Sequence, residues 1–257
     1  RRIKQYNGKT INGIKYIRKR RNIRTIKTTN EVMEAYRILI SSWTSSFRYP
    51  NIISGYQPTL HVPPISTVLG ILNACAGKYI RHKHLSLGYY FEYGAEAVDL
   101  ETIYQIKLNE RNVPVNQVKS NVIPREFLFD NRLFLYLKDK ELTDLFLSPY
   151  YPILLGRSSD LASVDRIEIV ELSEKTNADK IKGQIIPIAG NFLPGMVQAL
   201  PKYFTDTFPR SNIGTEAYSV ISYRSKDIPT GITAYRDIID GNEVDIYFHQ
   251  LDFEDDI

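Results

Sequence analysis

Two hydroxyl residues, Ser66 and Thr67, follow a pair of prolines and open an apolar run with helical spacing. Proline fixes φ and keeps the preceding residue out of the α region, so Val62 and Pro63 are expected to be extended. Ser66 or Thr67 is then well placed to cap a helix over residues 66–80. A helix start with free N–H groups beside two hydroxyls favours anions, and a nucleic-acid backbone is one candidate.

A second segment with phosphate-binding chemistry is Gly156-Arg157-Ser158-Ser159. Glycine lets the backbone come close to a phosphate, arginine offers a planar fork, and the serines add hydroxyl donors. A glycine-containing turn with one arginine is common, so an ordinary surface turn is the alternative interpretation.

Arg48, with Tyr49 and Tyr56, places a cation near aromatic rings. This combination suits the unstacked bases of a single strand. The alternative is a surface arginine whose aliphatic stem covers aromatic residues of the core.

The four histidines do not form a pattern typical of a nuclease. His82 and His84 lie in a cationic run, which is typical of a solvated turn, while His249 falls on a terminal strand. His61 lies on the approach to the helix and could contact RNA. No carboxylate or histidine cluster has ligand spacing and no nucleotide-binding glycine pattern occurs, so we expect no catalytic residue, no metal and no cofactor.

The predicted helix carries a second, small-residue stripe made of Gly70, Ala74 and Gly77. Glycine costs ~1 kcal/mol against alanine inside a helix, so two glycines on one face indicate that another element comes close. Tight packing on a sheet is the plainest explanation.

Strands are predicted by β-forming or alternating residues over 36–40, 89–96, 100–108, 132–137 and 166–172, with a short helix over 138–147. We interpret 89–96 and 100–108 as a strand pair joined by a turn. Segment 109–126 is rich in amides, bases and proline, which predicts an excursion from the sheet or an ordinary exposed hairpin.

The last third of the chain is expected to form a charged loop (173–184), an irregular or briefly helical stretch (192–208), and three strands of a smaller second sheet. Those strands are predicted at 216–223, 232–236 and 243–249. The acidic residues 254–256 are interpreted as a solvated tail.

The composition of the 257 residues fits one substantial core. No apolar run reaches the ~18 residues of a membrane span, and no signal-peptide pattern opens the chain. The single cysteine, Cys75, is expected to be a buried thiol in a reducing cytoplasm.

Charge is divided unevenly along the chain. Residues 1–32 hold eleven Lys or Arg and one acid, a net charge of +10, whereas the rest hold 22 bases and 28 acids, a net charge of −6. The leader lacks an initiator Met and is interpreted either as a remnant of vector or fusion origin or as a basic arm for nucleic acid. Its recurring isoleucines are also compatible with a short hairpin or a docked strand.

Four segments carry a family resemblance: Ser45-Ser46-Phe47-Arg48, then Pro63 to Leu72, Arg125 to Asp130, and Leu154 to Ser159. Their order and spacing resemble the Cas-five family of CRISPR-associated proteins, most closely the type I-B branch, over roughly residues 33–250. That family is a branch of the RAMP superfamily.

The resemblance implies an α+β fold, a ferredoxin-like (RRM-like) RAMP domain with a β-hairpin thumb insertion and a smaller C-terminal β-rich region. It divides the chain into a basic extension (1–32), an RNA-binding domain (33–172, thumb at about 100–126) and the C-terminal region (173–257). The expected RNA-binding residues are Arg37, Arg48, Tyr49, Tyr56, His61, Ser66, Thr67, Gln117, Lys119, Arg125, Gly156, Arg157 and Ser158.

The resemblance further implies a non-catalytic, cytoplasmic subunit of a type I Cascade complex that caps the 5′ handle of a CRISPR RNA. Its partners would be that RNA, the backbone and large subunits, and target DNA through the complex, with no membrane. The alternative is a metal-independent endoribonuclease for repeat RNA, as in type I-C relatives that use a Tyr, a Lys and a His. A third option is an RRM-like module of an unrelated assembly.

Overall fold

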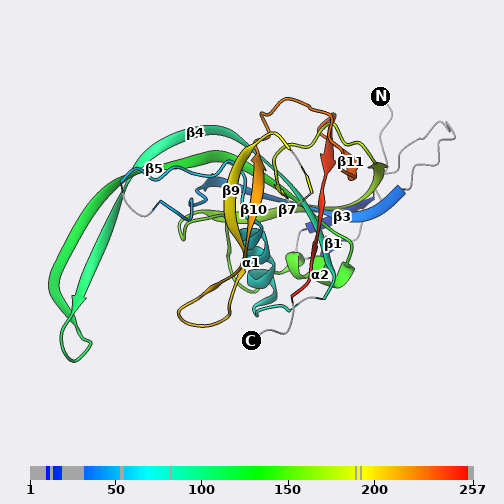
Figure 1. Cartoon of the computed structure of the whole chain (residues 1–257). Coiled ribbons are helices and arrows are strands. Elements are labelled where there is room, and N and C mark those ends of the chain that lie inside the picture. Colours follow the sequence, from blue (N-terminus) through cyan, green and yellow to red (C-terminus); the bar gives the residue numbers. More distant parts are fainter. Residues whose placement is uncertain are drawn as a thin grey trace, which may run out of the picture.

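A long strand, β3 (Val32–Ser45), forms the centre of the computed structural model (Figure 1). The structure describes residues 10–11, 14–18, 32–52, 55–81, 83–188, 190–191 and 193–253, with only the backbone for 10–11, 14–18, 116 and 117. A ten-stranded, mostly antiparallel sheet lies beside a three-stranded sheet, with helices α1 (Ile65–Ala76) and α2 (Lys140–Asp144). The α+β class is therefore confirmed.

The middle of the large sheet consists of four antiparallel strands in the order β7-β3-β5-β4. Here β4 is Leu85–Leu108, β5 is Pro114–Leu137 and β7 is Leu161–Lys175. Along the chain the order is β3, α1, β4, β5, α2, β7. A turn of 3₁₀ helix, Leu145–Leu147, follows α2, whose start is capped by the Asp139 carboxylate, so the short helix over 138–147 is confirmed.

Both faces of this sheet are covered. Ile38 and Ile40 of β3 pack in one core with α1, while Ala35 and Leu39 point into a second core on the opposite face. Because strands buried on both faces have no polar side, the predicted strand over 132–137 is an almost continuous apolar run.

Helix α1 begins one residue earlier than predicted and without a side-chain cap. Pro64 is its N-cap, with φ −57° and ψ 151°, and no side chain accepts from the first turn. The expectation that Ser66 or Thr67 would cap the helix is wrong, because both lie inside the first turn. The helix ends at Ala76, since Gly77 takes the left-handed conformation at φ 70°.

The small-residue stripe of α1 faces away from the sheet, which corrects the expectation of sheet packing. Gly70 is exposed, and a Cβ placed on it would meet nothing within 4 Å. A Cβ on Gly77 would lie 2.4 Å from the Tyr150 ring, so that glycine is required by its neighbour as well as by its φ.

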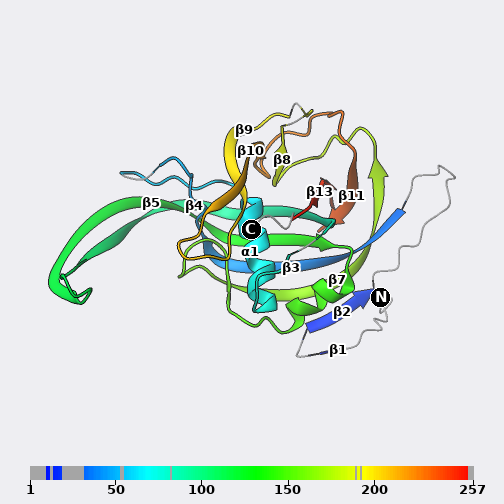
Figure 2. The ribbon, with the colours of Figure 1, turned by 60° about the horizontal axis from the view of Figure 1, so that its bottom comes forward.

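Strands β4 and β5 continue beyond the sheet as a two-stranded arm that curves away from the molecule (Figures 1 and 2). The turn expected between 96 and 100 is absent, because both strands pair through this region from Ala95 to Ile106. The excursion over 109–126 is the tip and returning strand of this hairpin. Pro114 is tolerated at the arm tip because β5 begins there and pairs on one side only. Pro124 uses its carbonyl, which accepts from the Gln57 N–H at 2.9 Å and needs no donor from the proline.

The three-stranded sheet has the order β8-β10-β9, with β8 Gln184–Pro187, β9 Met196–Phe204 and β10 Asn212–Ile221. The irregular or helical interpretation of 192–208 is wrong, because β9 is a strand that pairs with β10. Pro201 is compatible with it because β9 is an edge strand.

The other C-terminal strands join the large sheet, which corrects their assignment to a second sheet. β11 (Ala234–Ile239) pairs with β7 and with β12 (Asn242–Ile246), and β13 (Phe248–Leu251) pairs with β4. Short β6 (Ile153–Leu154) also pairs with β7.

Part of the basic leader also joins the large sheet. β1 (Thr10–Ile11) and β2 (Ile14–Arg18) form a hairpin, and β2 lies parallel to β7, as the leader's isoleucines indicated. The rest of the leader, His82 and the acidic tail 254–256 lie outside the described residues. No helix among the residues that the structure describes is long and apolar enough to span a membrane.

Candidate nucleic-acid interface

A groove of about 530 Å³ opens at the start of α1, and we call it the helix-start groove. The loop after β3, the first turn of α1, the base of the β4–β5 arm, the loop after β6 and the end of β9 all border it. Its lining includes many residues expected to bind RNA: Arg48, Ser66, Thr67, Arg125, Gly156, Arg157 and Ser158. Segments more than a hundred residues apart in sequence therefore converge at one place.

The first turn of α1 presents an uncapped helix start to this groove. It contains no acidic residue and receives no side-chain hydrogen bond. The first N–H groups of a helix have no intrahelical partner, and the helix dipole adds partial positive charge there. The Ser66 and Thr67 hydroxyls, which do not cap the helix, are available as additional donors.

Arg125 lies beneath the groove with 1% of its surface exposed. Its Nε donates to the Glu101 carboxylate, whereas its Nη2 is buried without a hydrogen-bond partner. An unpartnered buried donor is costly, at about 1–3 kcal/mol, and charged donors cost more. The unpartnered donor therefore lies within the wall of the groove, where its positive charge favours an anion in the groove.

Arg157 is held rigidly at the groove by Asp160, whose side chain is fully buried. The Arg157 backbone N–H and its Nε both donate to Asp160 Oδ2, at 2.9 and 3.0 Å, and Nη2 donates to Oδ1 at 2.9 Å. Hydrogen bonding to Asp160 raises the pKa of Arg157. Only Nη1 has no partner among the described residues, so Arg157 offers one oriented donor.

Gly156 has a structural reason for being glycine. Its φ is +120°, and a Cβ there would lie 2.4 Å from the Ser46 backbone oxygen. The glycine lets the loop after β6 pack directly against the segment that leads to Arg48, which brings the two arginine-bearing loops together.

Arg48 is the exposed cation of the groove and has no ion pair among the described residues. Beside it, half-buried Tyr49 donates its hydroxyl to Met196 Sδ at 3.2 Å and packs against the core. Three arginines and one carboxylate, Glu101, line the groove, so its local charge is positive although the body of the chain is acidic.

Arg37 lies outside the groove, on the opposite face of the sheet. Its guanidinium is 3% exposed and pairs with Glu168 and Asp237 at 2.5 and 2.6 Å. Burial alone would lower the pKa of Arg37, but the two carboxylates more than offset this and raise it. Arg37 is therefore part of a buried ion network that has no open face for a ligand.

The remaining expected residues are dispersed. Tyr56 is 48% exposed, and Lys119 is exposed on the arm. Gln117 is in β5, but its side chain is not among those described. His61 has its Nε2 3.7 Å from Glu96 Oε2, outside the groove lining.

The surroundings of His61 were not expected from the sequence. Glu96 accepts from the Tyr93 hydroxyl at 2.6 Å and from Arg224 at 3.2 Å, and the Arg224 guanidinium lies 4.9 Å from the Tyr93 ring centroid. Tyr93 and Glu96 are near neighbours on β4, but His61 and Arg224 are distant in sequence, so no motif could have identified the cluster. The cluster fastens the segment after β10 to β4.

The other histidine considered for catalysis, His249, is inaccessible. It is 4% exposed and stacks on Tyr89, and its burial lowers the pKa to about 4. Within the described part of the chain, no three His, Cys, Asp or Glu side chains are grouped to hold a metal ion.

No protein-family model and no curated protein matches the sequence. Similar solved structures include a chain of a CRISPR RNA-guided surveillance complex, at 16% identity and a TM-score of 0.48, covering 76% of this chain and 91% of that one. A chain of the type III-B Cmr-beta complex bound to cognate target RNA and AMPPnP has 10% identity, a TM-score of 0.46 and coverages of 76% and 86%.

A CRISPR protein from Archaeoglobus fulgidus is also similar, at 12% identity, with a TM-score of 0.41 and coverages of 83% and 99%. These structural neighbours are CRISPR-associated proteins. Since all three TM-scores are below 0.5, the backbones overlap only in part, and the functional proposal depends on the helix-start groove and on the sequence motifs.

Proposed function

We propose that this chain is a non-catalytic RNA-binding subunit of a type I-B-like CRISPR effector complex of the Cascade kind, and that it holds the 5′ handle of the CRISPR RNA. The observation that carries the proposal is the meeting of exposed Arg48, oriented Arg157, the uncapped α1 start and the unpartnered donor of buried Arg125 in one groove. Backbone phosphates of a single strand supply the anion, and the groove binds them without breaking a bond.

The strand order supports assignment to the ferredoxin-like RAMP proteins. The chain order β3, α1, β4, β5, α2, β7 with the sheet order β7-β3-β5-β4 is that of a βαββαβ unit. In this assignment the β4–β5 arm is the thumb.

The arm has the surface expected for contact with the backbone subunit. Alternate residues place apolar side chains on one face, each at least half exposed: Val98, Leu100, Tyr104, Ile106 and Leu108 of β4 with Val118 and Val122 of β5. Exposed apolar surface of this extent marks interaction sites. The large subunit and, through the complex, target DNA complete the proposed assembly.

Charge reversal at Arg48 tests the proposal. Arg48→Glu should weaken binding of a short single-stranded RNA by at least ~10-fold and abolish protection of the RNA 5′ end, because the exposed cation becomes an anion. Lys226→Glu is the matched control, since Lys226 is exposed and lines neither groove.

The double variant, Arg48→Glu with Arg157→Glu, should also prevent assembly of the complex. Its folding must be checked separately, because a glutamate at 157 would face the buried Asp160 carboxylate. Equal RNA affinity in Arg48→Glu and Lys226→Glu, with normal assembly, contradicts the proposal.

A second candidate function is a metal-independent endoribonuclease, and the contact of His61 with Glu96 beside Tyr93 favours it. A histidine next to a carboxylate is a possible general base. Incubation of the purified protein with repeat RNA in a metal chelator distinguishes the two functions. Cleavage at one position that is lost in His61→Ala would establish the nuclease, and intact RNA would reject it.

A further inference from the structure

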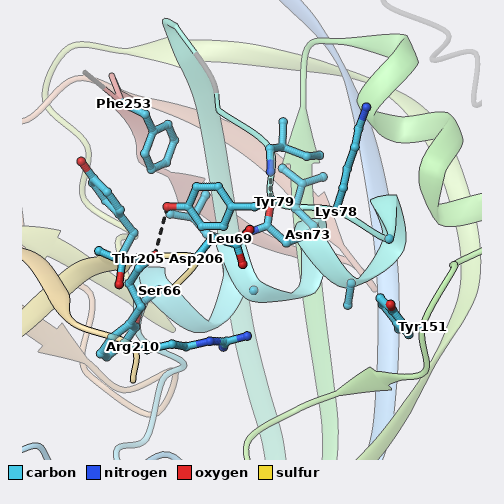
Figure 3. Close-up of a pocket in the computed structure, with 17 residues that line it drawn as sticks. Ser66, Leu69, Asn73, Lys78, Tyr79, Tyr151, Thr205, Asp206, Arg210 and Phe253 are labelled. Atoms are coloured by element: carbon cyan, nitrogen blue, oxygen red, sulfur yellow. Dashed lines mark hydrogen bonds between the residues drawn. The ribbon is translucent and has the colours of Figure 1, made fainter. Parts of the chain in front are cut away.

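A second groove, of about 400 Å³, lies between α1 and the β9–β10 hairpin, and we call it the hairpin groove. It follows the small-residue side of α1, including Gly70, and is closed on the other side by Phe204 and the loop to Arg210 (Figure 3). Its volume falls in the range of small-ligand sites, about 300–1,000 Å³.

The two grooves adjoin. Ser66 in the first turn of α1 and Phe204 at the end of β9 line both of them. A strand whose phosphates lie at the helix-start groove would therefore have the hairpin groove within reach of a neighbouring nucleotide.

The lining offers both kinds of hydrogen-bonding group that a base edge needs. Asn73 Oδ1 accepts from the Ile80 N–H at 2.9 Å, which orients the amide and leaves Nδ2 as a donor without a partner among the described residues. Asp206 supplies a carboxylate acceptor from the opposite wall. The donor lies on α1 and the acceptor on the hairpin, so a ligand between them could use both.

An aromatic ring and a cation complete the site. The Tyr79 hydroxyl donates to the Phe204 carbonyl at 3.0 Å, which fixes the ring across the groove. Arg210 is exposed, has no ion pair among the described residues, and reaches from the hairpin toward α1, whereas Lys78 points away (Figure 3). Aromatic stacking, a polar edge and a cation are the chemistry of single-strand base recognition.

We infer that the hairpin groove binds one unstacked nucleobase of the RNA strand held at the helix-start groove. This inference rests on the proposed function, because it requires the same RNA. The base lies against the open face of Gly70. This accounts for glycine at position 70, where no neighbouring residue would clash with a side chain.

The inference is tested by filling the groove. Gly70→Leu places a side chain into open space on a helix with ordinary φ, so it should not lower the thermal unfolding temperature. Gly231→Leu is the matched control, because Gly231 is exposed, lines neither groove and would also place its side chain into open space. The probe is a short, fluorescently labelled single-stranded RNA, used intact and with one base removed at each position in turn.

For the wild-type protein, removal of one particular base should weaken binding by about tenfold, the scale of losing one stacked base. Gly70→Leu should weaken binding of the intact RNA by a similar factor, and removal of that base should then cause no further loss. Gly231→Leu should behave like the wild-type protein.

Three outcomes overturn the inference. If Gly70→Leu binds intact RNA as tightly as the wild-type protein, no base occupies the groove. If the loss from Gly70→Leu simply adds to the loss at every abasic position, the substitution acts elsewhere. If the wild-type protein does not bind single-stranded RNA at all, the proposed function fails together with the inference, whereas the first two outcomes leave the proposed function intact.

Discussion

Arg125 shows how one residue can be unfavourable for folding and favourable for binding. Its guanidinium is buried and has only one carboxylate partner, Glu101, while Nη2 has none. Replacing a buried ion pair with uncharged groups is often neutral or stabilising, whereas a buried donor without a partner destabilises the fold. Under the proposed function, an RNA phosphate in the groove would offset this cost.

Replacing Arg125→Met together with Glu101→Gln separates these two roles. We expect an unchanged or higher free energy of unfolding, because a partly unsatisfied buried charge is removed, and at least ~10-fold weaker RNA binding. Urea unfolding and RNA titration measure the two quantities. As a control, Lys182→Met with Asp227→Asn removes an ion pair outside both grooves, and it should alter neither. Unaltered RNA affinity in the Arg125 variant would show that Nη2 meets no anion.

His249 makes stability depend on pH in a definite direction. Burial lowers its pKa to about 4, below the ordinary value of about 6.5 that holds in the unfolded chain. As the pH falls between these values, the unfolded chain binds a proton that the folded protein excludes, so stability is lost by up to about 3 kcal/mol. Stability from this group is complete above about pH 6.5.

The measurement is urea unfolding at neutral pH and at about pH 5, a window in which only histidines titrate at their ordinary pKa. His249→Gln keeps a hydrogen-bonding side chain and removes the titration, so its stability should change less over this interval. An equally steep loss in His249→Gln would assign the pH dependence to other groups.

At the scale of the element, helix α1 packs on the sheet with one side and borders the hairpin groove with the other. Its large apolar residues face the sheet, while Gly70 faces the hairpin groove and Gly77 ends the helix against Tyr150. Two glycines in the same stripe thus have different physical causes. One is compatible with a side chain, and the other is fixed by backbone conformation and by a neighbour.

Alanine substitution distinguishes the two glycines. Gly70→Ala should raise the free energy of unfolding by ~1 kcal/mol, because it restores helix propensity and meets no neighbour. Gly77→Ala should lower it by more than ~1 kcal/mol, because a Cβ at φ +70° is strained and collides with Tyr150. Chemical denaturation measures both changes, and equal effects of the same sign would contradict this account.

At the scale of the whole molecule, the helix-start groove lies on the α1 side of the large sheet. The β4–β5 arm extends beyond the sheet (Figure 2). No described residue between 103 and 121 belongs to a hydrophobic core cluster, so the arm tip contributes little to the fold. The body is buried on both faces of the sheet, while the arm has an exposed apolar face.

Shortening the arm tests this division. Residues 103–121 can be replaced by Asn-Gly, because Thr102 and Val122 are directly paired and this turn closes such a pair. We expect an unfolding temperature within a few degrees of the wild-type value and unchanged RNA affinity, but loss of binding to the proposed backbone subunit, measured by co-purification. Loss of RNA affinity would instead show that the arm itself grips the strand.

The sequence by itself determined the α+β class, the proline-led start of α1, the buried strand over 132–137 and the identity of the arginine-bearing loops, since these depend on local backbone restriction and on periodicity. It misassigned 96–100 and 192–208, because polar and proline residues are compatible with strands that pair on one side only.

Only the tertiary structure decided which residues meet. It brought Arg48, Ser66 and Arg157 together, buried Arg37 in an ion network, left Arg125 with a buried donor that has no partner, and turned Gly70 toward a groove rather than a sheet. The sequence shows which side chains are charged, but the partners that neutralise them lie on strands that are distant in the chain. The long-range pairing of the sheet therefore determines which of these charges remain available to a ligand.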